Sequence, residues 1–232
     1  AGMVAVFYCQ DRRLLAHPLC AVCTVREQNK RAVCNLSGIA RFNAYGAIKD
    51  IQGIDDRPVK IGRIVNQAGS FDIEKREVRR PISELNPDAM FGVLFYGGQV
   101  TSFRRQLIKA TASNKQAAMG FIDSRAENLG TCLGNSVAQA LQMLHQSAAR
   151  YQAVILVSDG TPTRCPFARL NGCGEKQAVC NEVLGQITAA NARRMPVHCI
   201  LVGNADRCNG LPTQFMRAVS GLSGGSFRHV PQ

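Results

Sequence analysis

Three short polar segments of the sequence combine small turn residues with oxygen-bearing side chains. They are residues 66–70 (Asn-Gln-Ala-Gly-Ser), residues 130–131 (Gly-Thr) and residues 158–160 (Ser-Asp-Gly). Hydroxyl and carboxylate oxygens are the ligands that a hard cation such as Mg²⁺ prefers in proteins. The sequence therefore indicates a shallow polar site wherever these segments meet, with Asp159 as its only carboxylate.

The elements that must position these segments alternate between apolar strands and amphipathic helices from about residue 59 onward. Strands are predicted at residues 59–65, 91–96, 153–157, 197–202 and 227–230, and helices at residues 72–86, 113–123, 133–148, 175–193 and 212–220. This order is typical of an α/β fold of three layers, with a mostly parallel central sheet and helices on both faces. Ligands bind beyond the carboxyl ends of such strands, so the three segments are expected at one edge.

The first quarter of the chain lacks this alternation. A strand is predicted at residues 3–8, and residues 1–57 are interpreted as a small cysteine-containing β segment that precedes the α/β domain at residues 58–232. This segment contains Cys9, Cys20, Cys23 and Cys34, of which Cys20 and Cys23 have the spacing that zinc sites use. Zinc bound by these four residues and two disulfides among them are both consistent with the sequence.

The later cysteines lie near the loops of the expected binding edge. Of the ten cysteines in the chain, a group of five is predicted to form disulfides there, namely Cys165, Cys173, Cys180, Cys199 and Cys208. Cys132, at the start of a predicted helix, fits a disulfide or a buried thiol equally well. An even and high cysteine count favours an oxidising compartment, and hence an extracellular or cell-surface protein, with the cytoplasm as the alternative.

The chain is strongly basic. Its formal net charge is +12, with a pI of about 9.6, and the densest basic cluster contains Lys75, Arg76, Arg79 and Arg80. Such an excess favours an anionic partner, for example an acidic glycan, a membrane surface or nucleic acid, although a generally basic surface gives the same number. Nucleic acid is the less favoured partner, because Trp is absent and Tyr is scarce. No apolar stretch is long enough to span a bilayer.

Catalytic motifs are absent from the sequence. A phosphate loop, a nucleophile elbow and a zinc-protease motif are all missing. His198 and Cys199 are adjacent on a predicted strand, so their side chains point to opposite faces and cannot form a nucleophile–base pair. The sequence therefore predicts a protein without enzymatic activity.

The three polar segments, taken in order, resemble the metal-ion-dependent adhesion site of von Willebrand factor A domains. The resemblance covers residues 59–231 and implies the fold of that family, with Mg²⁺ bound at the edge of the sheet. Ser70, Thr131 and Asp159 match the family's ligand positions, whereas Asn66 stands where the family has Asp and Ala68 where it has Ser. The resemblance thus implies a degenerate site whose Mg²⁺ binding is weak or absent.

Three functions follow as hypotheses. The first is a non-enzymatic module for protein binding or cell adhesion, or a scaffold, whose partner docks near Ser70, Thr131 and Asp159. The second is a basic intracellular module that binds nucleic acid or an anionic assembly and holds zinc in its N-terminal cysteines. The third is a structural subunit of a filament or pilus-like assembly, in which free edge strands of the N-terminal β segment join a neighbouring chain.

Overall fold

A computed structural model of the protein describes the backbone of residues 2–9 and all atoms of residues 69–127, 130–147, 151–166 and 169–232. These residues belong to one of the two units into which the chain divides. The predicted strand at residues 59–65 lies outside the described residues, as do Asn66, Ala68, Cys20, Cys23 and Cys34.

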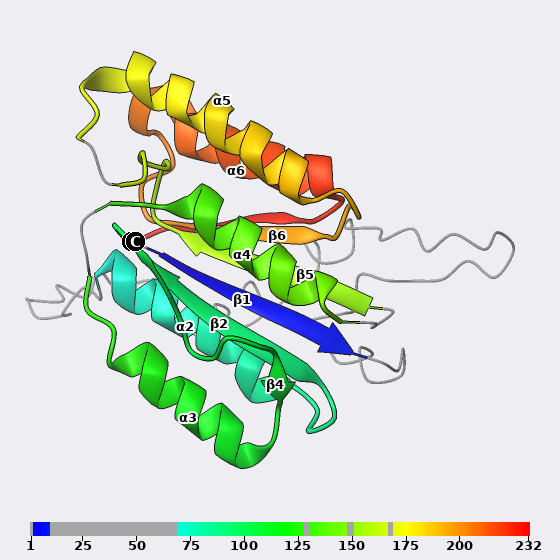
Figure 1. Cartoon of the computed structure of the whole chain (residues 1–232). Coiled ribbons are helices and arrows are strands. Elements are labelled where there is room, and N and C mark those ends of the chain that lie inside the picture. Colours follow the sequence, from blue (N-terminus) through cyan, green and yellow to red (C-terminus); the bar gives the residue numbers. More distant parts are fainter. Residues whose placement is uncertain (1, 10–68, 128–129, 148–150, 167–168) are drawn as a thin grey trace, which may run out of the picture. The chain divides into compact units, whose positions relative to one another are not determined.

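Strands and helices alternate through most of the described chain (Figure 1). The strands are β1 (Gly2–Cys9), β2 (Met90–Tyr96), β3 (Val100–Ser102), β4 (Ile108–Lys109), β5 (Tyr151–Ser158), β6 (Val197–Val202) and β7 (Phe227–Val230). The helices are α2 (Ser70–Glu84), α3 (Ala112–Asp123), α4 (Leu133–His145), α5 (Gly172–Ala190) and α6 (Arg207–Ser223). The predicted α/β fold of three layers is therefore confirmed.

The seven strands form one mixed sheet in the order β3-β2-β1-β5-β6-β7, with β4 also paired to β2. β5, β6 and β7 pair in parallel, whereas β1 is antiparallel to both β2 and β5. Four strands, β2, β5, β6 and β7, consequently run in the same direction and end at the same edge. Parallel pairing is limited to β5, β6 and β7, because the antiparallel strand β1 separates β2 from β5. The sheet therefore contains fewer parallel pairs than the predicted mostly parallel sheet.

The position of β1 corrects the predicted domain organisation. Residues 2–9 were expected in a separate N-terminal segment, but β1 lies inside the sheet with Gly2 opposite both Tyr96 and Ser158. Pairing on both sides satisfies the backbone N–H and C=O groups of this strand in the middle of the fold. β1 therefore offers no free edge for joining a neighbouring chain. The predicted boundary between residues 57 and 58 falls outside the described residues.

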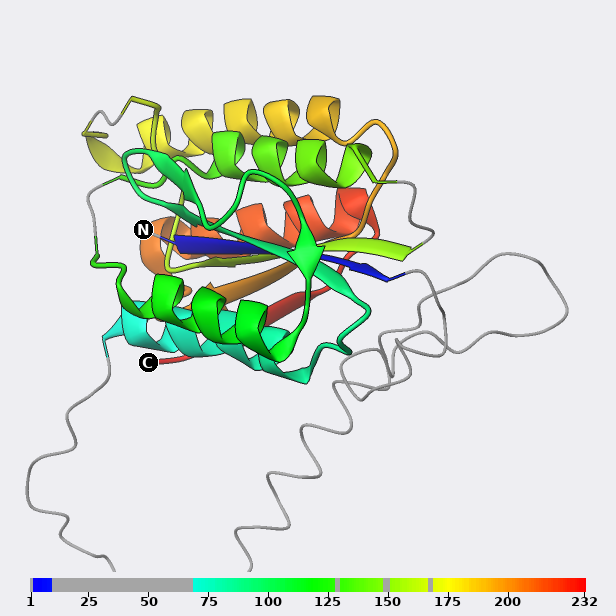
Figure 2. The same cartoon turned by 60° about the horizontal axis from the view of Figure 1, so that its bottom comes forward.

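Two hydrophobic cores lie on the two faces of the sheet, and Figure 2 shows the helices that cover both faces. Side chains alternate between the faces along each strand, so Leu94 and Leu156 face α4, α5 and α6, while Val93 and Val157 face α2 and α3. Helices on both faces bury both sets of side chains, which makes the fold a three-layer sandwich. No described helix has the length and apolar character needed to cross a membrane.

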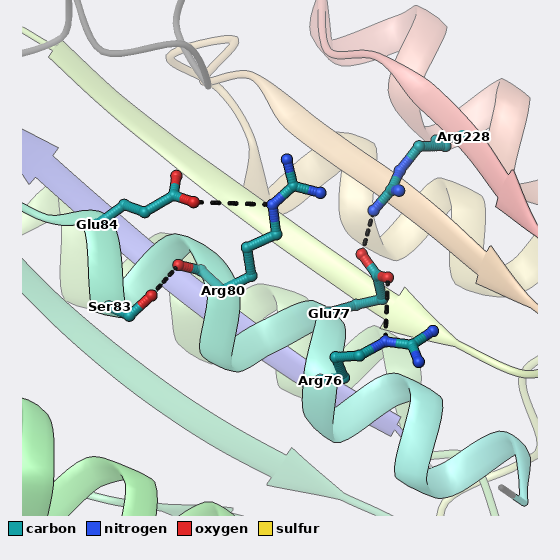
Figure 3. A network of polar contacts seen from close by, with 6 residues as sticks. All are labelled: Arg76, Glu77, Arg80, Ser83, Glu84 and Arg228. Atoms are coloured by element: carbon teal, nitrogen blue, oxygen red, sulfur yellow. Dashed lines mark hydrogen bonds and ion pairs between the residues drawn. The ribbon is translucent and has the colours of Figure 1, made fainter. Parts of the chain in front are cut away.

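Ion pairs hold α2 against the rest of the domain (Figure 3). Glu77 on α2 is buried and pairs with Arg228 on β7, the last strand of the sheet. Arg79, two residues further along the helix, pairs with Asp123 at the end of α3. These contacts fix the helix whose first turn carries Ser70, one of the predicted site residues.

Candidate functional site

The loops that contain Thr131 and Asp159 are joined by hydrogen bonds at the edge where β2 and β5 end. The backbone N–H of Thr131 donates to Oγ1 of Thr163 at 2.7 Å, and the N–H of Thr163 donates to the Thr131 carbonyl at 3.0 Å. The N–H of Cys132 donates to the carbonyl of Gly97, directly after β2, at 2.8 Å. Three loops from distant parts of the sequence are thus held side by side.

A disulfide strengthens the same junction. Cys132, beside Thr131, is bonded to Cys165, which lies in the loop that follows Asp159. The second disulfide joins Cys173 at the start of α5 to Cys208 at the start of α6. Covalent links between neighbouring loops reduce the conformational freedom of the chain that they enclose. This edge of the sheet is therefore a stiff surface.

The disulfide predictions are confirmed for three cysteines and wrong for two. Cys165, Cys173 and Cys208 form disulfides, and Cys132 is the partner of the first. Cys180 and Cys199 were also expected to form disulfides but are buried free thiols. Both belong to the hydrophobic core under α5 and α6, where burial raises the pKa of the Cys180 thiol to about 12 and keeps it unreactive.

The first turn of α2 brings Ser70 to the same edge, because α2 and α4 begin where β5 ends (Figure 1). The carbonyl of Gly69 accepts the N–H groups of Asp72 and Ile73, and this starts the helix at Ser70. Ser70 is half-buried, Thr131 is 8% exposed and Asp159 is half-buried. Asn66 and Ala68, the positions at which the family pattern is lost, lie outside the described residues.

Glu74 is a site residue that the sequence did not single out. It lies four residues after Ser70, and residues at this spacing share one face of a helix. Its side chain is 1% exposed, and its Oε2 atom has no hydrogen-bond partner in the described structure. A signal for this residue does exist: Phe71, Glu74 and Val78 follow the spacing of a buried helix face, where a carboxylate is unusual.

The environment of Glu74 opposes its ionisation. Burial raises its pKa from 4.5 to about 9, and the charges of Asp159 and Glu127 act in the same direction, against the positive charge of the N-terminus, which lowers it. Two further carboxyl groups, those of Asp159 and Glu127, are thus within electrostatic reach of Glu74. In a protein with 28 basic and 16 acidic residues, this edge is a place where acidic side chains lie near Glu74.

The chemistry of these side chains fits a hard divalent cation. Ser70 and Thr131 contribute hydroxyl oxygens and Asp159 contributes a carboxylate, while Glu74, whose buried Oε2 atom has no hydrogen-bond partner among the described residues, is within electrostatic reach of Asp159. Among the described residues, no three His, Cys, Asp or Glu side chains are grouped so that they could hold a metal ion. A cation at this edge would therefore need hydroxyl or backbone oxygens in addition to the carboxylates.

The cavity beside the Cys132–Cys165 disulfide and the side chain of His198 offer little for acid–base catalysis. A cavity of about 470 Å³ opens beside the Cys132–Cys165 disulfide, and its polar side chains are the neutral amides of Gln99, Asn135 and Gln139. His198 is half-buried, burial lowers its pKa, and its Nδ1 accepts the backbone N–H of Ser226 at 3.1 Å. A neutral imidazole fixed in this way has a structural role.

The cations of the densest basic cluster all have partners within the domain. Arg76 pairs with Glu77 and Arg80 with Glu84 along α2, as Figure 3 shows. Arg79 pairs with Asp123, and the ammonium of Lys75 donates to the backbone carbonyl of that residue and lies 4.8 Å from the ring centre of Phe71. Arg79 and Lys75 thus attach α2 to α3, whereas Arg76 and Arg80 form ion pairs within α2.

Comparisons with known proteins agree on the fold. The structure is similar to a solved von Willebrand factor type A protein from Catenulispora acidiphila, with a TM-score of 0.52 and 15% sequence identity, over 70% of this chain and 34% of that one. In sequence, 112 residues are 23% identical to inter alpha-trypsin inhibitor heavy chain 4 of Mus musculus, and 124 residues are 23% identical to inter-alpha-trypsin inhibitor heavy chain H4 of Homo sapiens. No family model matches the chain.

The matched regions are short compared with the relatives. They cover 43% and 48% of this chain but only 12% and 13% of the two heavy chains. The chain thus spans about an eighth of the length of these curated relatives. At such identity and coverage, the similarity supports a shared fold and leaves the activities of the whole relatives outside the comparison.

Proposed function

Since the chain has the fold of a von Willebrand factor type A domain, we propose that it is a non-enzymatic protein-binding module. Its partner docks at the edge formed by the first turn of α2, the Thr131 loop and the loop that follows Asp159. The proposal rests mainly on one observation, the hydrogen-bonded and disulfide-bonded junction of the Thr131 and Asp159 loops. A stiff junction of this kind gives a partner a preformed surface and limits the entropy lost on binding.

Two further features support this function. The cavity at the edge is lined by neutral amides, which suit hydrogen bonding to a partner better than proton transfer. The two disulfides support an extracellular or cell-surface location, because disulfides persist in oxidising compartments.

The same edge holds a divalent cation weakly in this proposal. Ser70, Thr131 and Asp159 supply the oxygen ligands. The bound cation would offer a vacant coordination position to an acidic side chain of the partner. Asn66 replaces the acid that the family has at the start of the site, so the cation is held less firmly than in intact sites.

Nucleic-acid binding is less well supported. A nucleic-acid site requires cations that are free to contact phosphates. In the densest basic cluster, Arg76, Arg79 and Arg80 each have an acidic partner within the domain. The positive net charge is then a general property of the surface, which affects solubility and encounter rates.

Site-directed photocrosslinking tests where the partner docks. A photoreactive phenylalanine analogue replaces Gln99, which is exposed directly after β2 at the proposed edge. In a matched chain it replaces Gln146, which is exposed at the end of α4 on the opposite edge. Each full-length chain is irradiated with proteins secreted by the cells that produce it, and adducts of discrete mass are measured.

The proposal expects an adduct from position 99 and none from position 146. Asp159→Arg, or the milder Asp159→Asn, should reduce the yield about tenfold or more, which corresponds to at least about 1.4 kcal/mol of binding free energy. Asp88→Arg places the same charge change on an exposed residue before β2, at the opposite edge, and should leave the yield unchanged. Lack of an adduct at position 99, or an adduct that both Asp159 variants leave unchanged, would overturn the proposal.

A further inference from the structure

Glu74 has the features of a metal-coordinating side chain, because its buried carboxyl group has an oxygen with no hydrogen-bond partner among the described residues. The side chain is 1% exposed, yet its Oε2 atom accepts no hydrogen bond from any described group. By contrast Glu77, one turn later on the same helix and also buried, is paired with Arg228. Buried carboxyl groups are normally paired or hydrogen-bonded, because leaving one unsatisfied costs stability. An unpartnered oxygen at this depth is therefore available to contact a bound cation.

The position of Glu74 identifies where that partner would lie. Glu74 is one helical turn from Ser70 and close enough to Asp159 for their charges to interact. Thr131 belongs to the loop that is hydrogen-bonded to the segment after Asp159. Two carboxylates and two hydroxyls thus come from α2, the Thr131 loop and the end of β5. The nearby basic side chains of α2 already have partners of their own, so none of them neutralises Glu74.

We propose that Glu74 is a ligand of a divalent cation that Asp159 also binds, with the hydroxyls of Ser70 and Thr131 completing part of the coordination shell. The family pattern assigns no role to this helix position. In this chain Glu74 supplies a carboxyl group where Asn66 removes an acid, which offsets part of the charge that the weakened site has lost. The inference deepens the proposed function, on whose site it rests, by naming the ion and the carboxylate that hold the edge together.

Cation binding by the isolated full-length chain provides the test, and no partner is needed for it. The protein is freed of metal with EDTA and dialysed, and calorimetric titrations with MgCl₂ and with CaCl₂ give a dissociation constant for each ion. Thermal unfolding with and without each ion is a second readout, since a ligand that binds only the folded state raises the melting temperature. The variants are Glu74→Gln, which keeps the shape of the side chain, and the control Glu84→Gln on the exposed end of α2.

The proposal expects at least one of the two ions to bind the wild type and raise its melting temperature. Glu74→Gln should weaken that dissociation constant at least about tenfold and remove the thermal shift, whereas Glu84→Gln should retain both. If neither ion binds the wild type, or if Glu74→Gln binds as tightly as the wild type, the proposal is overturned. A stability change in EDTA together with unaltered ion binding would show that Glu74 is only a structural acid.

Failure of this inference is distinguishable from failure of the proposed function. Photocrosslinking at position 99 is repeated in EDTA. An adduct that persists there and still depends on Asp159, in a chain that binds no ion, overturns the cation site and leaves the docking site standing. Ion binding that depends on Glu74, in a chain that forms no adduct at position 99, overturns the docking site and supports the cation site.

Discussion

Replacing Glu74 with glutamine should change how the stability of the protein depends on pH. In the folded chain the pKa of this carboxyl is raised from 4.5 to about 9, first by burial and second by the charge of Asp159. The folded state therefore retains a proton that the unfolded chain releases above pH 4.5. By linkage, the stability present below pH 4.5 is lost progressively as the pH rises toward 9.

The size of the effect follows from the width of this interval. Between pH 4.5 and about pH 9, each pH unit lowers the free energy of unfolding by about 1.4 kcal/mol. The reason is that the unfolded chain has released a proton that the folded chain still holds. Between pH 5 and pH 7.5 the wild type should lose roughly 3 kcal/mol from this group alone. Glutamine has nearly the same shape and no proton to release, so Glu74→Gln should lack this loss.

Urea unfolding followed by circular dichroism at pH 5.0, 6.0 and 7.5 measures the effect. EDTA is present throughout, so that bound ions do not contribute. The quantity to compare is the difference in free energy of unfolding between Glu74→Gln and the wild type. It should rise by roughly 3 kcal/mol from pH 5.0 to pH 7.5, in favour of the variant. A comparison across pH removes any constant cost of introducing the amide group.

Glu84→Gln is the matched control, because it makes the same chemical change on an exposed residue of the same helix. Its difference from the wild type should stay constant across the three pH values. If the difference for Glu74→Gln is equally constant, Glu74 ionises in the folded protein as it does in the unfolded chain. The reasoning from its burial and its missing partner would then be refuted.

Three other substitutions test the structure around the site. Removing the disulfide with Cys132→Ala and Cys165→Ala together should lower the free energy of unfolding by roughly 3–4 kcal/mol, because the bond encloses a loop with a sequence separation of 33; urea unfolding that matches the wild type would contradict this. Arg228→Ala should cost about 2 kcal/mol, since it leaves the buried Glu77 with only Arg76, at 3.9 Å, as an ion-pair partner among the described residues, and Arg228→Lys should restore part of the loss in the same assay. Gly225→Ala should lower the melting temperature markedly, because a Cβ atom there would lie 2.0 Å from a backbone carbonyl of β6; an unchanged melting temperature in calorimetry would show that this approach is not close.

The order of strands and helices could be predicted because burial repeats along these segments with a regular period. Helices expected at residues 133–148 and 175–193 appear as α4 (Leu133–His145) and α5 (Gly172–Ala190). Their buried side chains recur every three or four residues, which a sequence shows directly. The exact ends of the helices are harder to predict than their centres. The helix expected from residue 113, for example, begins as α3 at Ala112, with Thr111 as its N-cap, whose hydroxyl accepts the N–H of Asn114.

Strand pairing could not be predicted in the same way. The apolar stretch at residues 3–8 was correctly identified as a strand, and it appears as β1 (Gly2–Cys9). A short apolar stretch fits many neighbours equally well, since its hydrogen bonds come from the backbone and not from its side chains. Its place between β2 and β5, and its direction against both, are therefore properties of the assembled sheet.

Cysteine pairing has the same limit. The spacing of cysteines in a sequence does not determine which of them meet in space. Cys173 and Cys208 are joined because the first turns of α5 and α6 lie together, whereas Cys180, only two turns into α5, is buried in the core. Position relative to the binding edge separates the bonded cysteines from the free ones, and that position becomes known only with the fold.

Glu74 shows how a departure from an expected pattern can point to a function. Hydrophobic patterning places this residue on the buried face of α2, where an apolar side chain would stabilise the fold at every pH. A carboxyl group at that position costs stability near neutral pH unless something neutralises it. The charge of the buried Glu77 is balanced by the ion pair with Arg228. No described side chain forms such a pair or a hydrogen bond with Oε2 of Glu74. A cation bound together with Asp159 would remove this cost, and the loss of an acid at Asn66 would then be compensated in part by an acid from the helix.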